Sequence, residues 1–272
     1  MKTLRRLIIL QSIILILVSC SNDIGTEDKF VENSGGTQNT EPPGYDPSSI
    51  AGAVLWLDAA DESSLFQQSD CTVSSENTDR VGCWRDKSGQ NNHATASGDD
   101  RPTYHSSSVE LTGDAHSNNN GTCFDLTSDM SAKSVFLVVE NIRSNAGSIH
   151  GLFGSGLVSR YIFLASGGSY GISFDGTGSD NGRYSINDGA LSPYGENVSV
   201  SGALTSDLQL LQLDFQTMRT DWINLGCFNH GAGPKTYRAN YDIKEIIVFN
   251  QDVAAQDQIE LKEYLNEKWS IY

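Results

Sequence analysis

Long hydrophobic runs are missing from this 272-residue sequence beyond its first 20 residues. A transmembrane helix needs about 20 consecutive apolar residues, whereas the run from Leu7 to Val18 is shorter and is interrupted by Gln11 and Ser12. Basic residues precede this run and small Ser19 follows it, which is the pattern of a cleaved export signal. The sequence therefore predicts a signal peptide over residues 1–19 and no membrane span.

Basic residues are scarce as well, with 18 Lys and Arg against 34 Asp and Glu, which gives a formal charge of −16. Nucleic-acid binding needs basic patches that neutralise phosphates, and the chain has no Lys/Arg cluster after Arg6, so nucleic acid is excluded as a partner. Removal of residues 1–19 takes away Lys2, Arg5 and Arg6 and no acidic residue, so −16 becomes −19. Carboxylates in this number make calcium the one cofactor that the composition suggests.

The segment Leu17-Val-Ser-Cys20 resembles the bacterial lipobox, whose cysteine becomes the lipidated first residue of the mature protein. An ordinary secretory signal that ends near a cysteine is the alternative. Residues 20–47 are rich in Ser, Asn, Gly and Thr and cannot bury enough apolar surface to fold, so we expect a flexible tether. Its acidic start resembles signals that send lipoproteins to the outer surface. We expect a lipid-anchored protein of the outer membrane or cell surface, with the periplasmic face as the alternative.

Four cysteines remain after Cys20, and an even number in an oxidising compartment suggests disulfides with three possible connectivities. The polar, loop-like segment between Cys71 and Cys83 favours a bridge between these two, which leaves Cys123 to pair with Cys227. Free buried thiols are the alternative. A zinc site is disfavoured because no Cys-x-x-Cys or His-x-His spacing is present.

Short apolar segments separated by turn-forming residues fill the chain from residue 48 to residue 272. Tyr170, Ile172 and Phe174 alternate with small or polar residues, which gives a strand one buried and one solvated face. Segments of this length indicate a single all-β sandwich domain. The expected strands are 53–57, 134–142, 161–164, 170–174, 183–186, 197–200, 208–215, 221–225 and 242–249.

Only residues 253–268 depart from this pattern. They place Leu261, Tyr264, Leu265 and Lys268 at helical spacing, with Ile259 and Trp269 flanking the same face. The expected fold is therefore an all-β sandwich that ends in one short α-helix, whose apolar stripe packs on a sheet.

Several phrases resemble the bacterial laminin-G-like domains of the concanavalin A-like lectin/glucanase superfamily. They are Val54–Asp61, Cys83–Thr95, Arg101–Tyr104 and, at the end, Ile259–Trp269. The resemblance covers residues 48–272 and implies a jelly roll of two antiparallel sheets, but it implies no activity, because fold and function are separable. The chain departs from the family after Arg101–Tyr104, where a polar insert replaces the usual Phe-Asp-Gly phrase.

The sequence contains no clear catalytic motif. Glucanases of this superfamily place their carboxylates on one strand in a Glu-x-Asp-x-Glu pattern, which this chain lacks, and Glu260 and Glu263 fit the solvated face of the helix. The segment Gly167–Gly171 matches Gly-x-Ser-x-Gly, but a further expected strand follows it, so a β-hairpin is the better interpretation. His93 is interpreted as a loop-bracing residue.

Candidate ligand contacts remain. Aromatic rings that can stack on sugars lie in or beside loop-like segments at Tyr170, Tyr184, Tyr194 and Tyr237. A calcium site could use Asp175, Asp180 and Asn181, although the same glycine-rich residues also fit a hairpin turn.

Three functions therefore stay open. We expect non-catalytic recognition of a glycan or of a surface protein by an envelope protein held to the membrane through its lipid alone. The alternatives are a polysaccharide-processing glycosidase or lyase whose carboxylates come from separate strands, and a structural adhesion protein.

Overall fold

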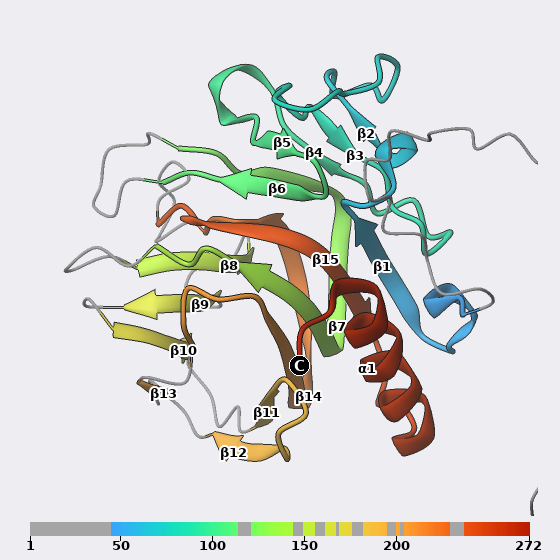
Figure 1. The fold of residues 1–272 in the computed structure, drawn as a ribbon, viewed down its shortest axis with the longest axis vertical. Coiled ribbons are helices and arrows are strands. Elements are labelled where there is room, and N and C mark those ends of the chain that lie inside the picture. The colour runs from blue at the N-terminus through green and yellow to red at the C-terminus, as the bar shows by residue number, and fades with distance from the viewer. Residues whose placement is uncertain are drawn as a thin grey trace, which may run out of the picture. The chain divides into compact units, whose positions relative to one another are not determined.

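Antiparallel strands dominate the fold, as predicted, and one α-helix closes the chain (Figure 1). The computed structural model describes residues 45–113, 121–143, 149–155, 161–166, 169–175, 182–194, 200–201, 204–228 and 237–272. All of them belong to the unit Asn39–Tyr272.

The elements follow one another along the chain in this order: the 3₁₀ helix η1 (Pro47–Ser49), β1 (Ala53–Asp58), η2 (Glu62–Ser64), β2 (Leu65–Phe66), β3 (Cys83–Trp84), β4 (Ala94–Thr95), η3 (Gly98–Asp100), β5 (Thr103–His105), β6 (Ser108–Leu111), β7 (Phe124–Glu140), β8 (Ile149–Ser155), β9 (Tyr161–Ser166), β10 (Ser169–Asp175), β11 (Gly182–Ile186), β12 (Ser192–Tyr194), β13 (Val200–Ser201), β14 (Gln209–Leu225), β15 (Tyr241–Phe249) and α1 (Ala255–Trp269).

Two strands of 17 residues each, β7 and β14, pair with one another and run through both layers of the sandwich. Their register shifts between Asp214 and Trp222, and such irregularities bend a strand pair. On one side of the bend the strand order is β1-β15-β7-β14-β11-β12. Strand β6 also pairs with the start of β15, and β5 pairs with β6. On the other side the strand order is β2-β3-β4-β7-β14-β8-β9-β10-β13. We call these the first and second layers.

The main core lies between the two layers and follows the two-residue period of the strands. From the first layer, alternate residues of β7, β14 and β15 point inward, among them Leu137, Leu213 and Ile246. From the second layer, Trp84 and Trp222 fill the same core. Trp222 is 1% exposed and stacks on Phe153 at 4.4 Å between ring centroids.

The opposite face of the first layer is also buried, because α1 covers it. The outward residues Phe136, Ile247 and Phe249 form a second apolar cluster with the helix. Leu261 and Leu265 supply the helix side of this cluster, as the helical spacing predicts.

Several boundaries differ from the sequence-based expectation. Strand β7 begins ten residues before the expected segment 134–142, because Phe124 and Leu126 alternate with exposed polar residues that hid the pattern. The expected segments 208–215 and 221–225 form one strand, β14. Ile259 is 52% exposed and does not join the buried face of α1.

Candidate functional site

An open hollow of about 330 Å³ lies on the first layer, beside the bend of the long strands. We call it the β11–β14 depression. Its lining consists of Lys133, Gly182, Arg183, Asp214, Phe215, Gln216 and Asp252. This volume is at the lower end of the range of ligand pockets, about 300–1,000 Å³.

The strand registers explain why these side chains meet. Arg183 of β11 lies directly opposite Asp214 of β14, which in turn lies opposite Ser134 of β7. Opposed residues in an antiparallel pair share one face of the sheet. Lys133 adjoins the same row, and Asp252 reaches it from the segment that connects β15 to α1.

Two ion pairs organise the charges of the depression. Arg183 Nη2 lies 3.3 Å from Asp214 Oδ2, and Lys133 Nζ lies 3.5 Å from Asp252 Oδ1. Lys133 Nζ also donates to the carbonyl of Gln216 at 2.7 Å. The Arg183 and Asp252 side chains are 57% and 80% exposed, whereas Asp214 is 6% exposed, so the depression has a buried acidic floor and a charged, accessible rim.

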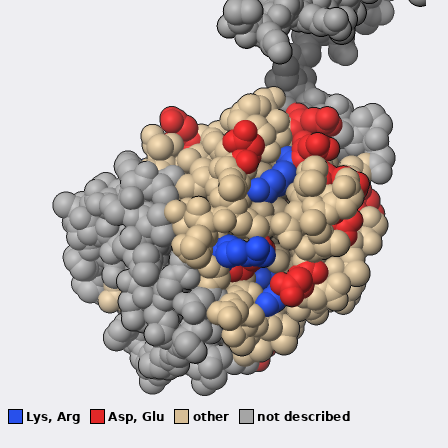
Figure 2. All heavy atoms as spheres, turned by 90° about the horizontal axis from the view of Figure 1, so that it is seen from below, with Lys and Arg blue, Asp and Glu red and all other residues tan. Residues whose placement is uncertain are grey.

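Figure 2 shows one face of the molecule with its charged residues coloured. Basic side chains there lie close to acidic ones and do not form a continuous basic surface.

A second group of charges lies under the C-terminal end of α1. Lys268 Nζ lies 2.8 Å from Asp58 Oδ2 and 2.9 Å from Glu245 Oε2, and all three side chains are at most 1% exposed. A register shift in β15 between Ile243 and Glu245 turns the Glu245 carboxylate toward the helix. We call Asp58, Glu245 and Lys268 the buried triad.

Polar neighbours satisfy the Glu245 carboxylate. It accepts hydrogen bonds from Trp56 Nε1 at 2.8 Å, from Trp269 Nε1 at 2.7 Å and from the Tyr264 hydroxyl at 3.0 Å. Trp56 and Trp269 therefore direct their indole N–H groups to a buried carboxylate. On the outer side of the buried triad, Lys87 Nζ bridges the carboxylates of Asp58 at 2.9 Å and Asp61 at 3.2 Å.

The two acids of the triad have pKa values shifted in opposite directions. Burial raises the pKa of Glu245, and the charge of Asp58 raises it further, against the opposing effect of Lys268. Burial would also raise the pKa of Asp58, but the charges of Lys268 and Lys87 outweigh burial and hold this pKa below its usual value. Perturbed acids are candidates for chemistry, yet these lie beneath α1, where a polymer cannot reach them, and they fasten the helix to the sheet.

The phrase between Cys83 and Thr95 forms a structural latch. The Asp86 carboxylate accepts hydrogen bonds from the backbone N–H groups of Trp56 at 2.9 Å, Ser88 at 2.8 Å and Asn92 at 2.9 Å. Asn92 Nδ2 donates to the carbonyl of Val54 at 2.7 Å. Since β1 pairs with β15 along its other side, these side chains cover its second edge, which protects it from pairing with another chain.

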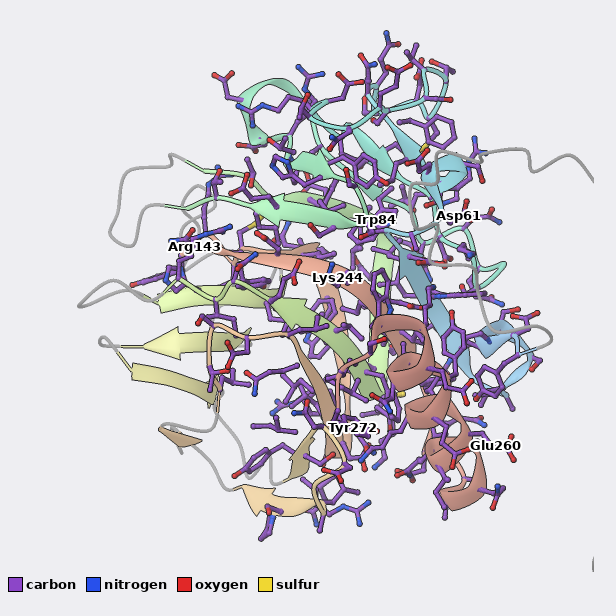
Figure 3. The ribbon with its side chains drawn as sticks, viewed as in Figure 1. Asp61, Trp84, Arg143, Lys244, Glu260 and Tyr272 are labelled. Atoms are coloured by element: carbon purple, nitrogen blue, oxygen red, sulfur yellow. A yellow bond between two sulfur atoms is a disulfide. The ribbon has the colours of Figure 1, made fainter. Side chains whose placement is uncertain are left out.

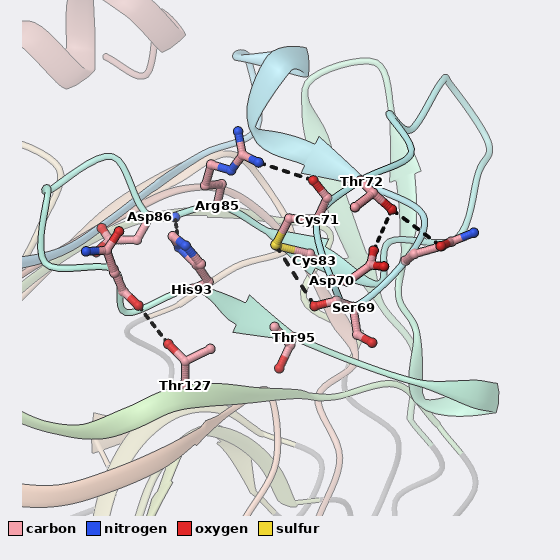
Figure 4. The surroundings of a disulfide bond; sticks show 12 residues. Ser69, Asp70, Cys71, Thr72, Cys83, Arg85, Asp86, His93, Thr95 and Thr127 are labelled. Atoms are coloured by element: carbon pink, nitrogen blue, oxygen red, sulfur yellow. Dashed lines mark hydrogen bonds between the residues drawn. A yellow bond between two sulfur atoms is a disulfide. The ribbon is translucent and has the colours of Figure 1, made fainter.

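His93 braces this latch, as the sequence analysis proposed. Its Nδ1 accepts a hydrogen bond from the backbone N–H of Asp86 at 3.1 Å (Figure 4). Burial lowers the pKa of His93, and the charge of Arg85 acts in the same direction.

The structure joins Cys71 to Cys83 and Cys123 to Cys227, which is the pairing that the sequence favoured over the other connectivities and over free thiols. Figure 4 shows the first bridge, where Arg85 Nη2 donates to the carbonyl of Cys71 at 3.1 Å. The second bridge joins the start of β7 to the residues just after β14.

Two of the four tyrosines proposed as ligand contacts have side-chain packing that the structure describes. Tyr184 is half-buried against the main core, on the face of β11 opposite Arg183, and Tyr237 stacks on Phe228 at 4.6 Å. Tyr170 lies in β10 and Tyr194 lies in β12. Their roles in binding stay predictions.

Most residues proposed for the calcium site and for the lipid anchor lie outside the part of the chain that the structure describes. Asp175 ends β10, whereas Asp180, Asn181 and Cys20 lie outside the described residues. Within the described ranges, no group of three or more His, Cys, Asp or Glu residues could hold a metal ion. The turn alternative concerns residues 176–181, which also lie outside the described residues; of the flanking strands, β10 pairs with β9 and β13, and β11 pairs with β12 and β14.

Two other sequence interpretations are confirmed. Strands β9 and β10 form an antiparallel pair around the Gly-x-Ser-x-Gly match, so this segment is a hairpin and not a nucleophile elbow. Glu260 and Glu263 are exposed on α1, and Figure 3 labels Glu260 on this helix. Among the described helices, none is long and apolar enough to cross a membrane.

The residues of the depression were missed by sequence reasoning. Arg183, Asp214 and Asp252 belong to no motif, and each lies in or beside a segment interpreted only as a strand or a helix start. A weak signal existed in β14, where the polar residues Gln212 and Asp214 occupy one face of an otherwise apolar strand. Nothing local indicates that this face meets β11 and the segment before α1.

No family model matches the chain, and no curated protein matches it. Among solved structures, a GH54 α-L-arabinofuranosidase soaked with a cyclic sulfate inhibitor is similar over 81% of this chain and 60% of its own, with 12% identity and a TM-score of 0.42.

A K499G mutant of the NanB sialidase from Streptococcus pneumoniae is similar over 56% of this chain, with 17% identity and a TM-score of 0.30. A structure of NanB with optactamide is similar over 54%, with 17% identity and a TM-score of 0.29. This chain matches 27% of the length of each NanB chain. Likenesses at these scores carry no information on the activity of this protein.

Proposed function

We propose that residues 48–272 form a non-catalytic recognition domain that binds a glycan in the β11–β14 depression. The observation that carries this proposal is the rim, where the exposed Arg183 and Asp252 are each paired with a less exposed group of opposite charge. Sugar hydroxyls both donate and accept hydrogen bonds, so a surface that offers guanidinium donors and carboxylate acceptors together suits them.

The charge of the depression favours a neutral glycan. Its two cations, Lys133 and Arg183, balance its two carboxylates, Asp214 and Asp252. The whole chain carries −16, and a net charge of one sign repels polymers of the same sign. A polyuronate or sulfated polymer is therefore disfavoured relative to an uncharged polysaccharide.

A non-catalytic role is supported by the position of the perturbed acids. Glycosidases need a pair of carboxyl groups on either side of the bond that they cleave. Asp58 and Glu245 are the described acids whose pKa values are shifted, and they are at most 1% exposed. In the depression, each carboxylate is instead paired with a cation.

A glycan array tests the proposal with the full-length protein in detergent, in the presence and absence of EDTA. We expect binding to neutral glycans that falls at least tenfold in Arg183→Met, because a hydrogen bond to a charged group contributes about 1.5–3 kcal/mol. Arg85→Met, which removes an exposed arginine beside the first disulfide, is the matched control and should bind normally. Loss of binding in EDTA would support the calcium site expected at Asp175, Asp180 and Asn181.

Two results would contradict the proposal. A protein that binds no glycan but releases sugar from a polysaccharide would be an enzyme. A protein that binds glycans equally well with Met at position 183 would use another surface, such as the tyrosines at positions 170 and 194.

We also propose that the domain is a laminin-G-like member of the concanavalin A-like superfamily, held to the outer membrane or cell surface by a lipid on Cys20. The latch at Cys83–Thr95 and the helix over Ile259–Trp269, two of the phrases behind the resemblance, support the first part. Labelling of growing cells with a palmitate analogue tests the second. A Cys20→Ser variant that keeps both the label and its membrane fraction would overturn the anchor.

A further inference from the structure

We infer that Gln212 is a positioning residue, which fixes both carboxylates of the β11–β14 depression through one hydrogen-bonded network that reaches α1. The inference rests on the proposed function for its ligand, but the network itself is visible in the structure. None of its members was selected from the sequence.

Gln212 is a polar side chain in a place where the sheet is otherwise apolar. It belongs to the outward row of β14, between Leu210, which packs under α1, and Asp214, which lines the depression. Its partner across β7 is the core residue Phe136. The Gln212 side chain is 0% exposed, so it cannot serve as a solvated surface group.

Both the nitrogen and the oxygen of the Gln212 side-chain amide form hydrogen bonds. Its Nε2 donates to the Asp214 carboxylate, at 3.3 Å to each oxygen, and to Gln258 Oε1 at 3.0 Å. Its Oε1 accepts from the Ser185 hydroxyl at 3.4 Å. The Ser185 hydroxyl in turn accepts from Lys262 Nζ at 2.9 Å.

The same network reaches the other carboxylate of the depression. Gln258 Nε2 donates to the carbonyl of Val253 at 2.8 Å, and Val253 directly follows Asp252. Gln258 and Lys262 are four residues apart on α1 and so share one face of the helix. The buried amide of Gln212 therefore bonds Asp214 directly and, through Gln258, reaches the backbone beside Asp252.

Stability alone does not require a glutamine here. Replacement of both partners of a buried hydrogen bond by apolar side chains of similar shape is often nearly neutral for stability, whereas a complete polar network specifies one geometry. Gln258 and Lys262 are only partly buried on α1. We conclude that Gln212 sets the separation and direction of the two carboxylates.

The test compares Gln212→Met with Gln209→Met in the full-length protein. Gln209 lies in the same strand and is 6% exposed, but it accepts a hydrogen bond from the Thr205 backbone N–H at 2.7 Å, away from the depression. For the best glycan of the array, we expect Gln212→Met to lose at least tenfold in affinity. Its thermal midpoint should also fall, because the buried Asp214 and Ser185 side chains each lose a hydrogen-bond partner, so affinity is measured well below the midpoint of each variant. Gln209→Met should keep wild-type affinity.

A double-mutant cycle separates positioning from general loosening. If Gln212 and Gln258 act through one network, Gln212→Met combined with Gln258→Met should lose no more affinity than Gln212→Met alone. Additive losses, or wild-type affinity in a folded Gln212→Met protein, would overturn the inference. If Gln212→Met does not fold, the glycan affinity of Gln258→Met is measured instead. A loss of affinity in this variant would support the inference, and wild-type affinity would overturn it.

Hydrogen exchange distinguishes failure of this inference from failure of the proposed function. A wild-type protein that binds no glycan contradicts the function, and the network is then judged without ligand. Backbone amide exchange over residues 252–254 should be faster in Gln212→Met than in wild type and unchanged in Gln209→Met. Equal exchange in all three proteins would show that Gln212 positions nothing.

Discussion

Lys268 Nζ lies 2.9 Å from Glu245 Oε2, and neither side chain is exposed to solvent. The helix residue and the strand residue thus form an ion pair between α1 and the first layer, and Asp58 of β1 completes it. Lys244, at the irregularity of β15, lies with its Nζ 5.1 Å from the Trp269 ring centroid. The end of α1 is fixed by charge as well as by apolar contact.

Lys268→Met should destabilise the protein by about 3–5 kcal/mol, because it leaves two buried carboxylates without their ammonium group. Urea unfolding monitored by tryptophan fluorescence measures this change. Glu267→Gln, at an exposed neighbouring position on α1, should leave the free energy of unfolding nearly unchanged. A loss in Lys268→Met no larger than in this control would mean that water enters the triad.

The latch on β1 predicts a second effect. Asp86→Ala removes an acceptor that serves three backbone N–H groups, which should cost at least about 1.5–3 kcal/mol, since hydrogen bonds to a charged acceptor are stronger than neutral ones. The backbone amide of Trp56 should also exchange faster with deuterium. Asp99→Ala, in an exposed turn, serves as the control, and equal exchange at Trp56 in both variants would contradict the latch.

The two disulfides should differ in their contributions to stability. Cys123 and Cys227 are 104 residues apart and Cys71 and Cys83 are 12 apart. Loop-closure entropy assigns about 4.7 kcal/mol to a 100-residue loop and about 3 kcal/mol to a 15-residue loop. Denaturant unfolding of the two double-alanine variants should therefore rank Cys123→Ala/Cys227→Ala as the less stable, and the reverse order would contradict the entropic account.

His150 predicts a dependence of stability on pH. Burial lowers its pKa from 6.5, while its Nδ1–H donates to the carbonyl of Arg238 at 3.1 Å. His150 therefore binds a proton near pH 6.5 in the unfolded chain but only at a lower pH in the folded chain. Its contribution to the free energy of unfolding is fully present above pH 6.5 and is lost as the pH falls toward the folded pKa. His93 acts in the same direction.

Comparison of wild type with His150→Gln isolates this effect, since the raised pKa of Glu245 makes the acid region change in the opposite direction. The difference in the free energy of unfolding between the two proteins should shift in favour of His150→Gln as the pH falls from 7 to 5. A pH-independent difference would show that water reaches the ring.

Much of the fold could be predicted from local patterns. Alternation in Tyr170–Phe174 and the apolar run of β15 predict strands because a pleated strand exposes its faces in turn. The helix follows from Leu261, Tyr264 and Leu265. The strand start at Phe124 could not be predicted, since its polar residues are also typical of loops and only the packing of Phe124 and Leu126 selects the strand.

The candidate site could not be predicted at all. Lys268 fits the helical stripe, but its role depends on Asp58 and Glu245, which are more than 200 and more than 20 residues away in the chain. In the sequence, Gln212 resembles an ordinary outward strand residue. Only the fold brings Gln258 of α1 close to it, with 3.0 Å between Gln212 Nε2 and Gln258 Oε1.

By itself, the sequence determined that this is an acidic, predominantly β-structured chain with one closing helix, because periodicity and composition act over a few residues at a time. The tertiary structure alone decided which polar side chains are buried together and which line the β11–β14 depression. The physical reason is that desolvation and hydrogen bonding depend on neighbours from distant strands, and those neighbours meet only when β7 and β14 bend and α1 closes over the first layer.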